Sequence, residues 1–313
     1  MGPGHPGTNI SWALALVSTL SFIPPSEGER TRMSRRDVFL SKESVLDMAP
    51  SSYDDQYRGC IEAMEAEIPK LFQYEYSLNK DFAEAWYSAT FRWEERKGKM
   101  VVPPGFKDQY AIAIFSYTSN GPLHKIFNDA VRQAGQSRDY YLRSFNFKVL
   151  HYYLTRALQM LDAVESPTCH KVFRGIKGVR FKPEPRKPVR FGQFTSSSKD
   201  DQSALSFGED TFFSIHTCYG VNIRNFSFFP SEEEVLIPPF EKFKVTDFST
   251  MSRKNIITLQ SVEKSSVYNC EFVKESDYIV FLPASHPGTG ILQIIPICWL
   301  MLLWGPQPWI PLF

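Results

Sequence analysis

The sequence predicts an α+β protein, because helix-like and strand-like patterns occupy separate parts of the chain that meet near Pro167. Before Pro167, apolar residues recur at spacings of three and four, which is the period of an amphipathic helix. After it, short runs rich in Phe, Val and Ile alternate with a period of two and are separated by Pro, Gly, Ser and Asn. The 313 residues are 43% hydrophobic and 15% aromatic, which is enough for a sizeable core. With no internal repeat or low-complexity linker, we expect one compact domain over residues 28–285.

Helices are expected over residues 53–76, 80–99 and 140–164. In the third segment, apolar side chains mark a single face; they are Phe145, Leu150, Tyr153, Leu154, Leu158 and Leu161. The apolar stretch 110–118 is compatible with either a buried strand or the end of a helix. The helical part therefore precedes the strands.

Strands of an antiparallel core are expected at short runs after Pro167. These runs are 172–176, 179–181, 189–194, 211–220, 234–238, 240–248, 255–262, 267–273 and 278–282. We expect the helices to pack on the sheet that these strands form.

The N-terminal end resembles a secretory signal peptide. Residues 10–23 form an apolar run that is too short to span a bilayer but has the length of a signal-peptide core. Pro24 and Pro25 close this run and disfavour the alternative of a buried N-terminal helix. We expect residues 1–27 to be removed.

The C-terminal end resembles a glycolipid-anchor signal. Residues 291–304 are apolar and uncharged and follow a stretch of small residues. Gln293 and Pro296 disfavour a transmembrane helix in this run. We expect residues 286–313 to be replaced by the anchor, with a plainly secreted form as the alternative.

The cysteines fit an extracellular compartment. Cys298 lies in the expected anchor signal, which leaves an even set, as a disulfide framework requires: Cys60, Cys169, Cys218 and Cys270. These four residues allow three pairings, and their wide spacing disfavours a zinc site. Asn225-Phe-Ser is a glycosylation sequon in a predicted loop.

The charge balance excludes a general attraction to nucleic acids or acidic membranes. The chain has 35 basic and 34 acidic residues, for a net charge of +1. A charge-based function must therefore be local.

Three carboxylates precede an apolar run in the stretch S-E-E-E-V-L-I-P-P-F, residues 231–240. In a strand, Glu232 and Glu234 would share a face and Glu233 would point to the other side. Two such carboxylates repel each other unless a cation or an electron-poor transition state lies between them. A solvated acidic loop is the alternative, and this motif alone does not decide between the two.

Two earlier segments contain residues suited to a nucleotide. Arg174 lies inside an apolar strand, where it needs a partner, and arginine suits bidentate phosphate recognition. Gly175 would let a ligand approach the backbone closely. An internal salt bridge is the alternative for Arg174. After Phe194, the hydroxyls of residues 195–198 could bond ribose or carboxylate oxygens, or cap a following helix.

In this order, the three segments resemble the arginine, serine-threonine-serine and glutamate-x-glutamate motifs of the ecto-mono-ADP-ribosyltransferases, arginine-modifying vertebrate branch. Stretches such as VFRGIKGVRF, VRFGQFTSSS and FSFFPSEEEVLIPPFEKFKV extend the resemblance along nearly the whole mature chain. The resemblance implies a helical N-terminal part packed on a β-sandwich core that binds NAD. It implies transfer of ADP-ribose from NAD to arginines of secreted or surface proteins, with NAD as the substrate and no metal. It also implies a monomer at the outer face of the plasma membrane, held there only by its anchor.

The resemblance also assigns roles to residues. Arg174, with Gly175 beside it, would hold the phosphates, and Ser196 would position the catalytic glutamate and the nicotinamide ribose. Glu234 would be the catalytic glutamate, and Glu232 the partner that marks arginine specificity. The resemblance further assigns Tyr117 and Gln193 as neighbours of the cofactor. Ser197 stands where the motif has threonine, which keeps the hydroxyl.

The disulfide pairing implied by the resemblance is Cys60 with Cys270 and Cys169 with Cys218. In the loop before the glutamates, Phe228 and Phe229 could stack on a guanidinium, or belong to the core. For one of them, the core is the expectation.

The implied chemistry agrees with the residue types. Loss of nicotinamide leaves a ribosyl cation, which a fixed Glu234 carboxylate would stabilise, and Glu232 would take a proton from the incoming guanidinium. Alternatives are an NAD glycohydrolase and a catalytically silent surface antigen of the same fold. A glycosidase fits poorly, because its carboxylates must flank a sugar ring, whereas these lie two apart on one strand face.

Overall fold

The structure is a computed structural model that describes residues 41–165 and 168–274. The chain divides into two units, Met1–Val273 and Lys274–Phe313, and all described residues except Lys274 belong to the first. The expected signal peptide, anchor signal and strand 278–282 lie outside the described residues. No helix in the described part combines the length and the apolar character that a membrane crossing needs.

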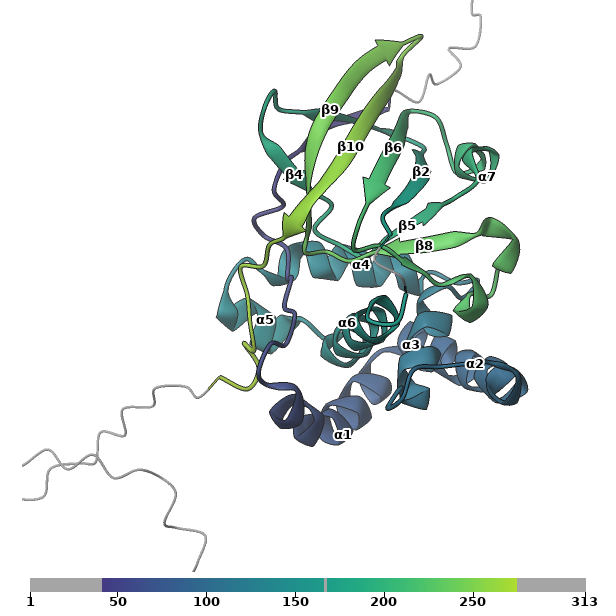
Figure 1. The fold of residues 1–313 in the computed structure, drawn as a ribbon. Coiled ribbons are helices and arrows are strands. Elements are labelled where there is room, and N and C mark those ends of the chain that lie inside the picture. The colour runs from purple at the N-terminus through teal and green to yellow at the C-terminus, as the bar shows by residue number, and fades with distance from the viewer. Residues whose placement is uncertain (1–40, 166–167, 275–313) are drawn as a thin grey trace, which may run out of the picture. The chain divides into compact units, whose positions relative to one another are not determined.

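After strand β1 (Lys42–Leu46), helices make up the first unit as far as residue 162 (Figure 1). They are α1 (Ile61–Leu78), α2 (Lys80–Arg96), the short 3₁₀ helix η1 (Lys97–Lys99), α3 (Asp108–Tyr117), α4 (Leu123–Ala134), α5 (Arg138–Ser144) and α6 (Lys148–Asp162). The expected helices are confirmed, but residues 53–60 are not helical and the expected segment 140–164 is broken between α5 and α6. The ambiguous stretch 110–118 is helical to Tyr117, and it is buried along that length, which explains its lack of a polar face.

The start of α6 depends on a distant carboxylate. Glu75 of α1 accepts hydrogen bonds from the backbone N–H groups of Lys148 (2.8 Å) and Val149 (3.0 Å), which have no partner inside the helix. Burial raises the pKa of Glu75 to about 7. Glu75 therefore caps the N-terminus of α6 from another helix. Local sequence patterns do not reveal such a cap, and so they do not show where α6 begins.

Most of the strands form one eight-stranded sheet in the order β4-β9-β10-β6-β2-β5-β8-β7, and β1 and β3 form a separate parallel pair. The strands are β1 (Lys42–Leu46), β2 (His170–Ile176), β3 (Val179–Pro183), β4 (Pro188–Arg190), β5 (Thr195–Ser198), β6 (Thr211–Thr217), β7 (Val221–Asn222), β8 (Glu234–Ile237), β9 (Glu241–Met251) and β10 (Lys254–Lys264). Between them lie α7 (Asp201–Ser206) and the 3₁₀ helices η2 (Arg224–Phe226) and η3 (Pro230–Glu232). The α+β class is confirmed.

Three details of the strand prediction are wrong. The sheet is mixed and not purely antiparallel, because β10 and β6 run parallel. The run 267–273 forms turns and no strand, since its backbone bonds to the loop at Asp54 and Asp55. The run 189–194 ends as a strand at Arg190, and residues 195–198 themselves form β5.

The eight-stranded sheet parts between β2 and β5. These two strands share a single register pair, Phe173 with Ser198, whereas β2 pairs with β6 along its whole length. In Figure 1, β5 and β8 accordingly run across the direction of β2 and β6. The sheet is therefore split into two groups of strands, and the split leaves room for a ligand.

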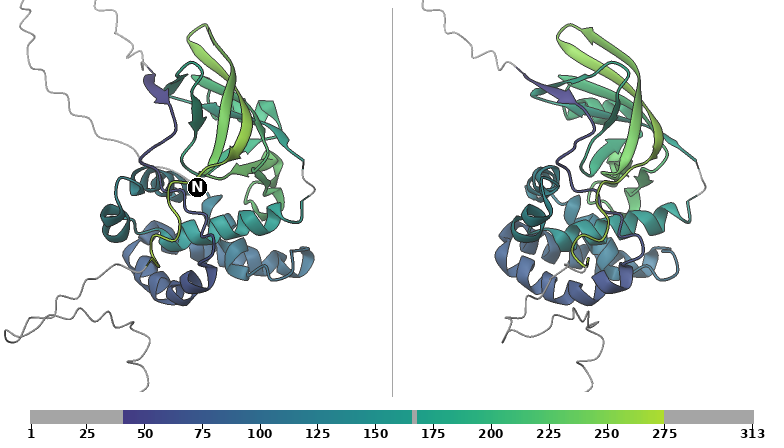
Figure 2. Two further views of the ribbon diagram at one scale, coloured as in Figure 1. Left: turned by 60° about the vertical axis from the view of Figure 1, so that its left-hand side comes forward. Right: turned by 90° about the vertical axis from the view of Figure 1, so that its left-hand side faces the viewer.

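The strands contribute to two cores, and β8 contributes to both. One cluster surrounds Phe213 and Phe243 and includes Val235 and Ile237 of β8. The helices form a larger cluster that includes Phe194, Val221 and Leu236 from the region of β5, β7 and β8. Figure 2 shows helices α1 to α6 gathered at one end of the sheet, whereas α7 packs against β2. The helical part thus packs on the group of strands that carries the serine and glutamate motifs.

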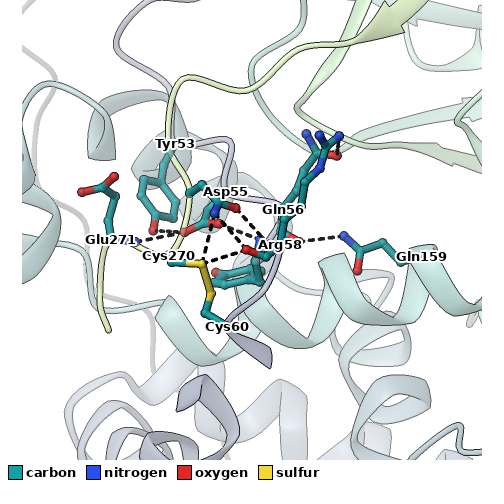
Figure 3. The surroundings of a disulfide bond; sticks show 10 residues. Tyr53, Asp55, Gln56, Arg58, Cys60, Gln159, Cys270 and Glu271 are labelled. Atoms are coloured by element: carbon teal, nitrogen blue, oxygen red, sulfur yellow. Dashed lines mark hydrogen bonds between the residues drawn. A yellow bond between two sulfur atoms is a disulfide. The ribbon is translucent and has the colours of Figure 1, made fainter. Parts of the chain in front are cut away.

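Both predicted disulfides are present, Cys60–Cys270 and Cys169–Cys218. Figure 3 shows the first, which joins the segment before α1 to residues near the end of the described chain. Beside it, the Asp55 carboxylate accepts from the Tyr53 hydroxyl (2.9 Å) and the Tyr57 N–H (2.7 Å). These bonds, with the disulfide, fix a buried loop that has no regular secondary structure.

Candidate active site

A cleft of about 670 Å³ opens where β2 and β5 part. Its walls come from β2, β5, the loop between α3 and α4, the start of α4, α7, η3 and the start of β8. The predicted site residues that line it are Tyr117, Arg174, Gly175, Ser196, Glu232 and Glu234. Segments more than 100 residues apart in sequence thus meet at one cavity.

Arg174 projects from β2 at the point where the β2–β5 ladder stops. Its Nη1 donates a hydrogen bond of 2.5 Å to the backbone carbonyl of Ser196, so the guanidinium bridges the two strands. No carboxylate of the described residues lies within salt-bridge distance of it, which disfavours the salt-bridge alternative. Its other N–H donors remain available to the oxygens of a phosphate.

Gly175 lines the cleft. We expected a glycine here so that a ligand could approach the backbone, but the structure gives another reason, which is packing against α7. A Cβ atom at this position would lie 2.2 Å from the carbonyl oxygen of Ala204 and 2.3 Å from that of Gly208. The absence of a side chain therefore lets α7 and the turn after it pack against β2. The effect on a ligand is indirect, because α7 forms part of the cleft wall.

We expect Gly175→Ala to lower the melting temperature and to weaken NAD binding together, because α7 must move away from β2. Overpacking of this kind costs about 1–3 kcal/mol. Thermal unfolding and calorimetric titration with NAD measure the two effects. Gly98→Ala is the matched control, since a Cβ there meets no atom within 4 Å. An unchanged melting temperature for Gly175→Ala would contradict the packing role.

The serines of β5 have separate partners. Ser196 forms a side-chain hydrogen bond with Glu234. Ser197 donates to the carbonyl of Val235 (2.7 Å), and Ser198 donates to the carbonyl of Glu232 (2.6 Å). None of these hydroxyls makes the N-cap bond of α7, which the Asp200 carboxylate makes instead. The helix-capping alternative is therefore wrong, and the serines hold the glutamate segment.

The two cleft glutamates do not share a strand face as expected. Glu232 ends η3, Glu233 adopts a left-handed conformation with φ 48° and ψ 47°, and Glu234 begins β8. This turn brings both Glu232 and Glu234 to the cleft. Glu233 instead pairs with Arg224 at 2.9 Å on the exposed side. The expected pair of carboxylates is present, but a turn and not the pleat of a strand creates it.

Glu234 is nearly fully buried, with 6% of its surface exposed. Burial raises the pKa of its carboxyl to about 7, and the negative charge of Glu232 adds to this rise. Hydrogen bonds from Ser196 and Ser227 and the charge of Arg174 act in the opposite direction. Burial also raises the pKa of Glu232. The pKa values of both carboxyls are thus shifted upward, toward neutral pH, as those of acid–base groups in active sites often are.

We expect a reaction that needs the Glu234 carboxylate to accelerate as the pH rises from about 6 to about 8, because the acid form predominates below the raised pKa. An unperturbed glutamate would be ionised throughout this range, and the rate would then be flat. Initial rates of nicotinamide release across this pH range, at saturating NAD, distinguish the two cases.

Tyr117 is a buried residue of α3 that acts on β5. Its hydroxyl donates to the carbonyl of Phe194 (3.0 Å) and accepts from the side-chain amide of Asn128 (3.0 Å). Burial raises the pKa of Tyr117, so the hydroxyl stays protonated. Gln193, by contrast, is not part of the cleft lining, and its side-chain oxygen accepts from Arg132 of α4. The expectation that Gln193 adjoins the cofactor is not supported by its position.

The sequence interpretation missed one whole wall of the cleft, formed by the α3–α4 loop and the start of α4. Its lining residues are Thr118, Ser119, Asn120, Gly121, His124, Lys125 and Asn128. The signal was the run of small and polar residues T-S-N-G-P directly before a helix. Of the two phenylalanines before the glutamates, Phe229 lines the cleft with 40% of its surface exposed, whereas Phe228 packs edge-on against Phe115.

One cluster of potential metal ligands is found in the part of the chain that the structure describes, namely Cys169, His216 and Cys218. The sulfur atoms of both cysteines are joined in the disulfide. They are therefore not available as thiolate ligands.

A family model and two curated relatives that match this chain carry the same description, arginine ADP-ribosyltransferase. A family described as NAD:arginine ADP-ribosyltransferase matches residues 46–267. The erythroblast NAD(P)(+)--arginine ADP-ribosyltransferase of Gallus gallus is 52% identical over 234 residues, which are 75% of this chain and 78% of that protein. The GPI-linked NAD(P)(+)--arginine ADP-ribosyltransferase 1 of Mus musculus is 47% identical over 283 residues, 87% of this chain and 86% of that protein.

Among solved structures, the eukaryotic mono-ADP-ribosyltransferase ART2.2 is 41% identical to this chain with a TM-score of 0.65. The match covers 72% of this chain and 98% of that one. A mutant of ART2.2 solved in complex with NAD matches with a TM-score of 0.64.

Proposed function

Since the chain belongs to the NAD:arginine ADP-ribosyltransferase family, we propose that it transfers ADP-ribose from NAD to arginine side chains of proteins and releases nicotinamide. The observation that supports this most directly is the arrangement of Arg174, Ser196, Glu232 and Glu234 around one cleft. A guanidinium suited to phosphate and two carboxylates with raised pKa are the groups that this reaction needs.

In the first step, the bond between the ribose C1′ and the nicotinamide nitrogen breaks, and nicotinamide leaves with the electron pair. Positive charge then develops on the ribose. Arg174 would bind the dinucleotide phosphates, and the Glu234 carboxylate, held by Ser196, would stabilise the developing charge. Because Glu234 is buried, this charge interaction is stronger than it would be in water.

In the second step, a guanidinium nitrogen of the acceptor forms a bond to C1′ and gives up a proton. A guanidinium has a pKa of about 12.5 or higher, so it is a poor nucleophile until a base takes that proton. Glu232 lies beside Glu234 in the cleft and is the candidate base. The exposed face of Phe229 could stack on the acceptor guanidinium.

Incubation of the mature protein with NAD labelled in its adenylate part, and with agmatine as a small guanidino acceptor, tests the proposal. We expect labelled ADP-ribosyl-agmatine and one equivalent of nicotinamide. Nicotinamide release without labelled agmatine would instead indicate an NAD glycohydrolase. Failure to release nicotinamide or bind NAD would overturn the proposed function.

We further propose that residues 28–285 form the catalytic domain and act at the outer cell surface. The Mus musculus relative is named as GPI-linked, which supports the anchor expected at residues 286–313. Target proteins would then be extracellular or surface proteins. We also propose a monomer, as the family resemblance implies. Release of activity from cells by a phosphatidylinositol-specific phospholipase would support the anchor, and activity found only in the medium would support the secreted form.

We also propose that Asn225 carries an N-linked glycan. It is exposed on η2, and no side-chain hydrogen bond occupies its amide in the described structure. Protein from a eukaryotic secretory host should shift in mobility after treatment with peptide-N-glycosidase F, and Asn225→Gln should abolish the shift.

A further inference from the structure

The segment that leads to the cleft glutamates is docked on the helical part of the protein. Arg96, the last residue of α2, donates from Nη1 to the backbone carbonyls of Asn225 and Ser227, each at 3.4 Å. The N–H of Phe228 donates to the Thr118 hydroxyl after α3 (3.3 Å). Arg92, one turn earlier in α2, lies over the Phe228 ring at 6.0 Å. The 225–229 loop is thus held by two helices, although it belongs to the strand-rich half of the chain.

Ser227 links this loop to Glu234. Its side chain has no exposed surface, and its hydroxyl has two partners. The Phe229 N–H donates to the hydroxyl oxygen (3.0 Å), and the hydroxyl lies 3.2 Å from Oε2 of Glu234. Because an N–H can only donate, the hydroxyl hydrogen is free to be given to the carboxylate. The direction of the bond from Ser227 to Glu234 is therefore fixed by the network around it.

We propose that Ser227 is a positioning residue for the catalytic carboxylate, and that Arg96 fixes Ser227 and thereby ties the geometry of Glu234 to α2. This inference rests on the proposed function and adds residues to it that none of the three sequence motifs contains. It also gives the helical part a role in positioning the catalytic carboxylate, exerted through Ser227, beyond support of the sheet.

Glu234 would then be held from two sides. Ser196 bonds it from β5 and Ser227 bonds it from the 225–229 loop. The charged or titratable groups that act on it are Glu232 from η3, Arg174 from β2 and Tyr117 from α3. The hydroxyls of Ser196 and Ser227 both favour the ionised form of Glu234, since each donates a hydrogen bond to its carboxylate. Without Ser227, the carboxylate would lose one donor and one restraint on its rotation.

We expect Ser227→Ala to lower kcat for nicotinamide release by roughly 10-fold at neutral pH, with the KM for NAD nearly unchanged. The acid limb of the pH–rate profile should move to higher pH, because the remaining donors stabilise the ionised form less. Much of the lost rate should therefore return at about pH 8.5. Ser227→Thr retains a hydroxyl and should keep the wild-type profile.

The glycosylation sequon requires a separate control, because Ser227 is also its third residue. Asn225→Gln removes the sequon but leaves the Ser227 hydroxyl in place. We expect Asn225→Gln to retain the wild-type kcat and pH profile. A change shared by Asn225→Gln and Ser227→Ala would assign the effect to the glycan and overturn the positioning role.

The Arg96 part of the inference is tested in the same assay. Arg96→Ala removes both bonds to the loop and should shift the profile in the same direction as Ser227→Ala, by a smaller amount. Glu94→Ala is the matched control, since the exposed Glu94 side chain of α2 acts only on Lys97 among the described residues and contacts neither Arg92 nor Arg96. If Ser227→Ala does not fold, as judged by thermal unfolding, Arg96→Ala carries the test.

Three outcomes separate the hypotheses. A wild-type protein that releases no nicotinamide refutes the proposed function itself. An active wild type with a Ser227→Ala variant of unchanged kcat and profile refutes the positioning role. A fall in kcat that is equal at every pH also refutes it, because this pattern reports only general loosening of the loop.

Discussion

Replacing Glu234 with glutamine is expected to abolish both nicotinamide release and ADP-ribose transfer. The side chain keeps its shape and its contacts with Ser196 and Ser227, but it can no longer carry the charge that opposes the developing ribosyl cation. Removal of one preorganised electrostatic group commonly costs about 100-fold or more in kcat. Single-turnover release of nicotinamide from labelled NAD measures the loss.

The neighbouring Glu233 provides a matched control for this change. It undergoes the same chemical substitution one residue away, but its side chain pairs with Arg224 on the exposed side of the turn. Glu233→Gln should therefore retain nearly full activity, since an exposed ion pair contributes about 1 kcal/mol or less to stability. NAD affinity of Glu234→Gln should remain measurable, which shows that the cleft is intact. Labelling of agmatine by Glu234→Gln at a rate near wild type would refute the catalytic role.

Replacing Glu232 with glutamine should separate transfer from hydrolysis. Transfer to agmatine needs a base for the guanidinium proton, and we expect it to fall by about 100-fold or more. Hydrolysis of NAD depends mainly on Glu234 and on water. Once the ribosyl cation has formed, water can attack it before losing a proton, whereas a protonated guanidinium cannot. We therefore expect hydrolysis to persist within about 10-fold of wild type.

The ratio of labelled agmatine to free ADP-ribose, in one reaction mixture, measures this separation. Glu233→Gln again serves as the control and should leave the ratio unchanged. Equal loss of both products from Glu232→Gln would contradict separate roles for the two glutamates. The geometry gives the expectation a physical basis, because Glu232 lies at the cleft but is less buried than Glu234.

The residue types of the site could be predicted from sequence, but several of their positions could not. Arg174, Ser196, Glu232 and Glu234 were identified by motif resemblance, and all four line the cleft. The disulfide pairing also came from resemblance, since four cysteines alone allow three pairings. The conformation of the glutamate segment was predicted wrongly, because a period of two was assumed through Glu233, whose positive φ breaks the strand.

The structure adds contacts between residues distant in sequence that local patterns do not show. Gly175 was assigned to close approach of a ligand, whereas the carbonyls of Ala204 and Gly208 occupy the space where a side chain would lie. Gln193 is two residues from Thr195 in sequence, yet its side chain turns to Arg132 and away from the cleft lining. Neither outcome can be inferred from local pattern, since each is set by packing between separate elements.

The sequence by itself determined the separation of helices from strands, the order of the motifs and the chemical groups available to the site. It could do so because periodicity and side-chain chemistry are local properties of the chain. Only the tertiary structure decided where the sheet parts, that a left-handed turn aims two glutamates at one cleft, and that α2 reaches Glu234 through Ser227. These features arise from contacts between residues far apart in sequence, whose relative positions exist only once the chain has folded.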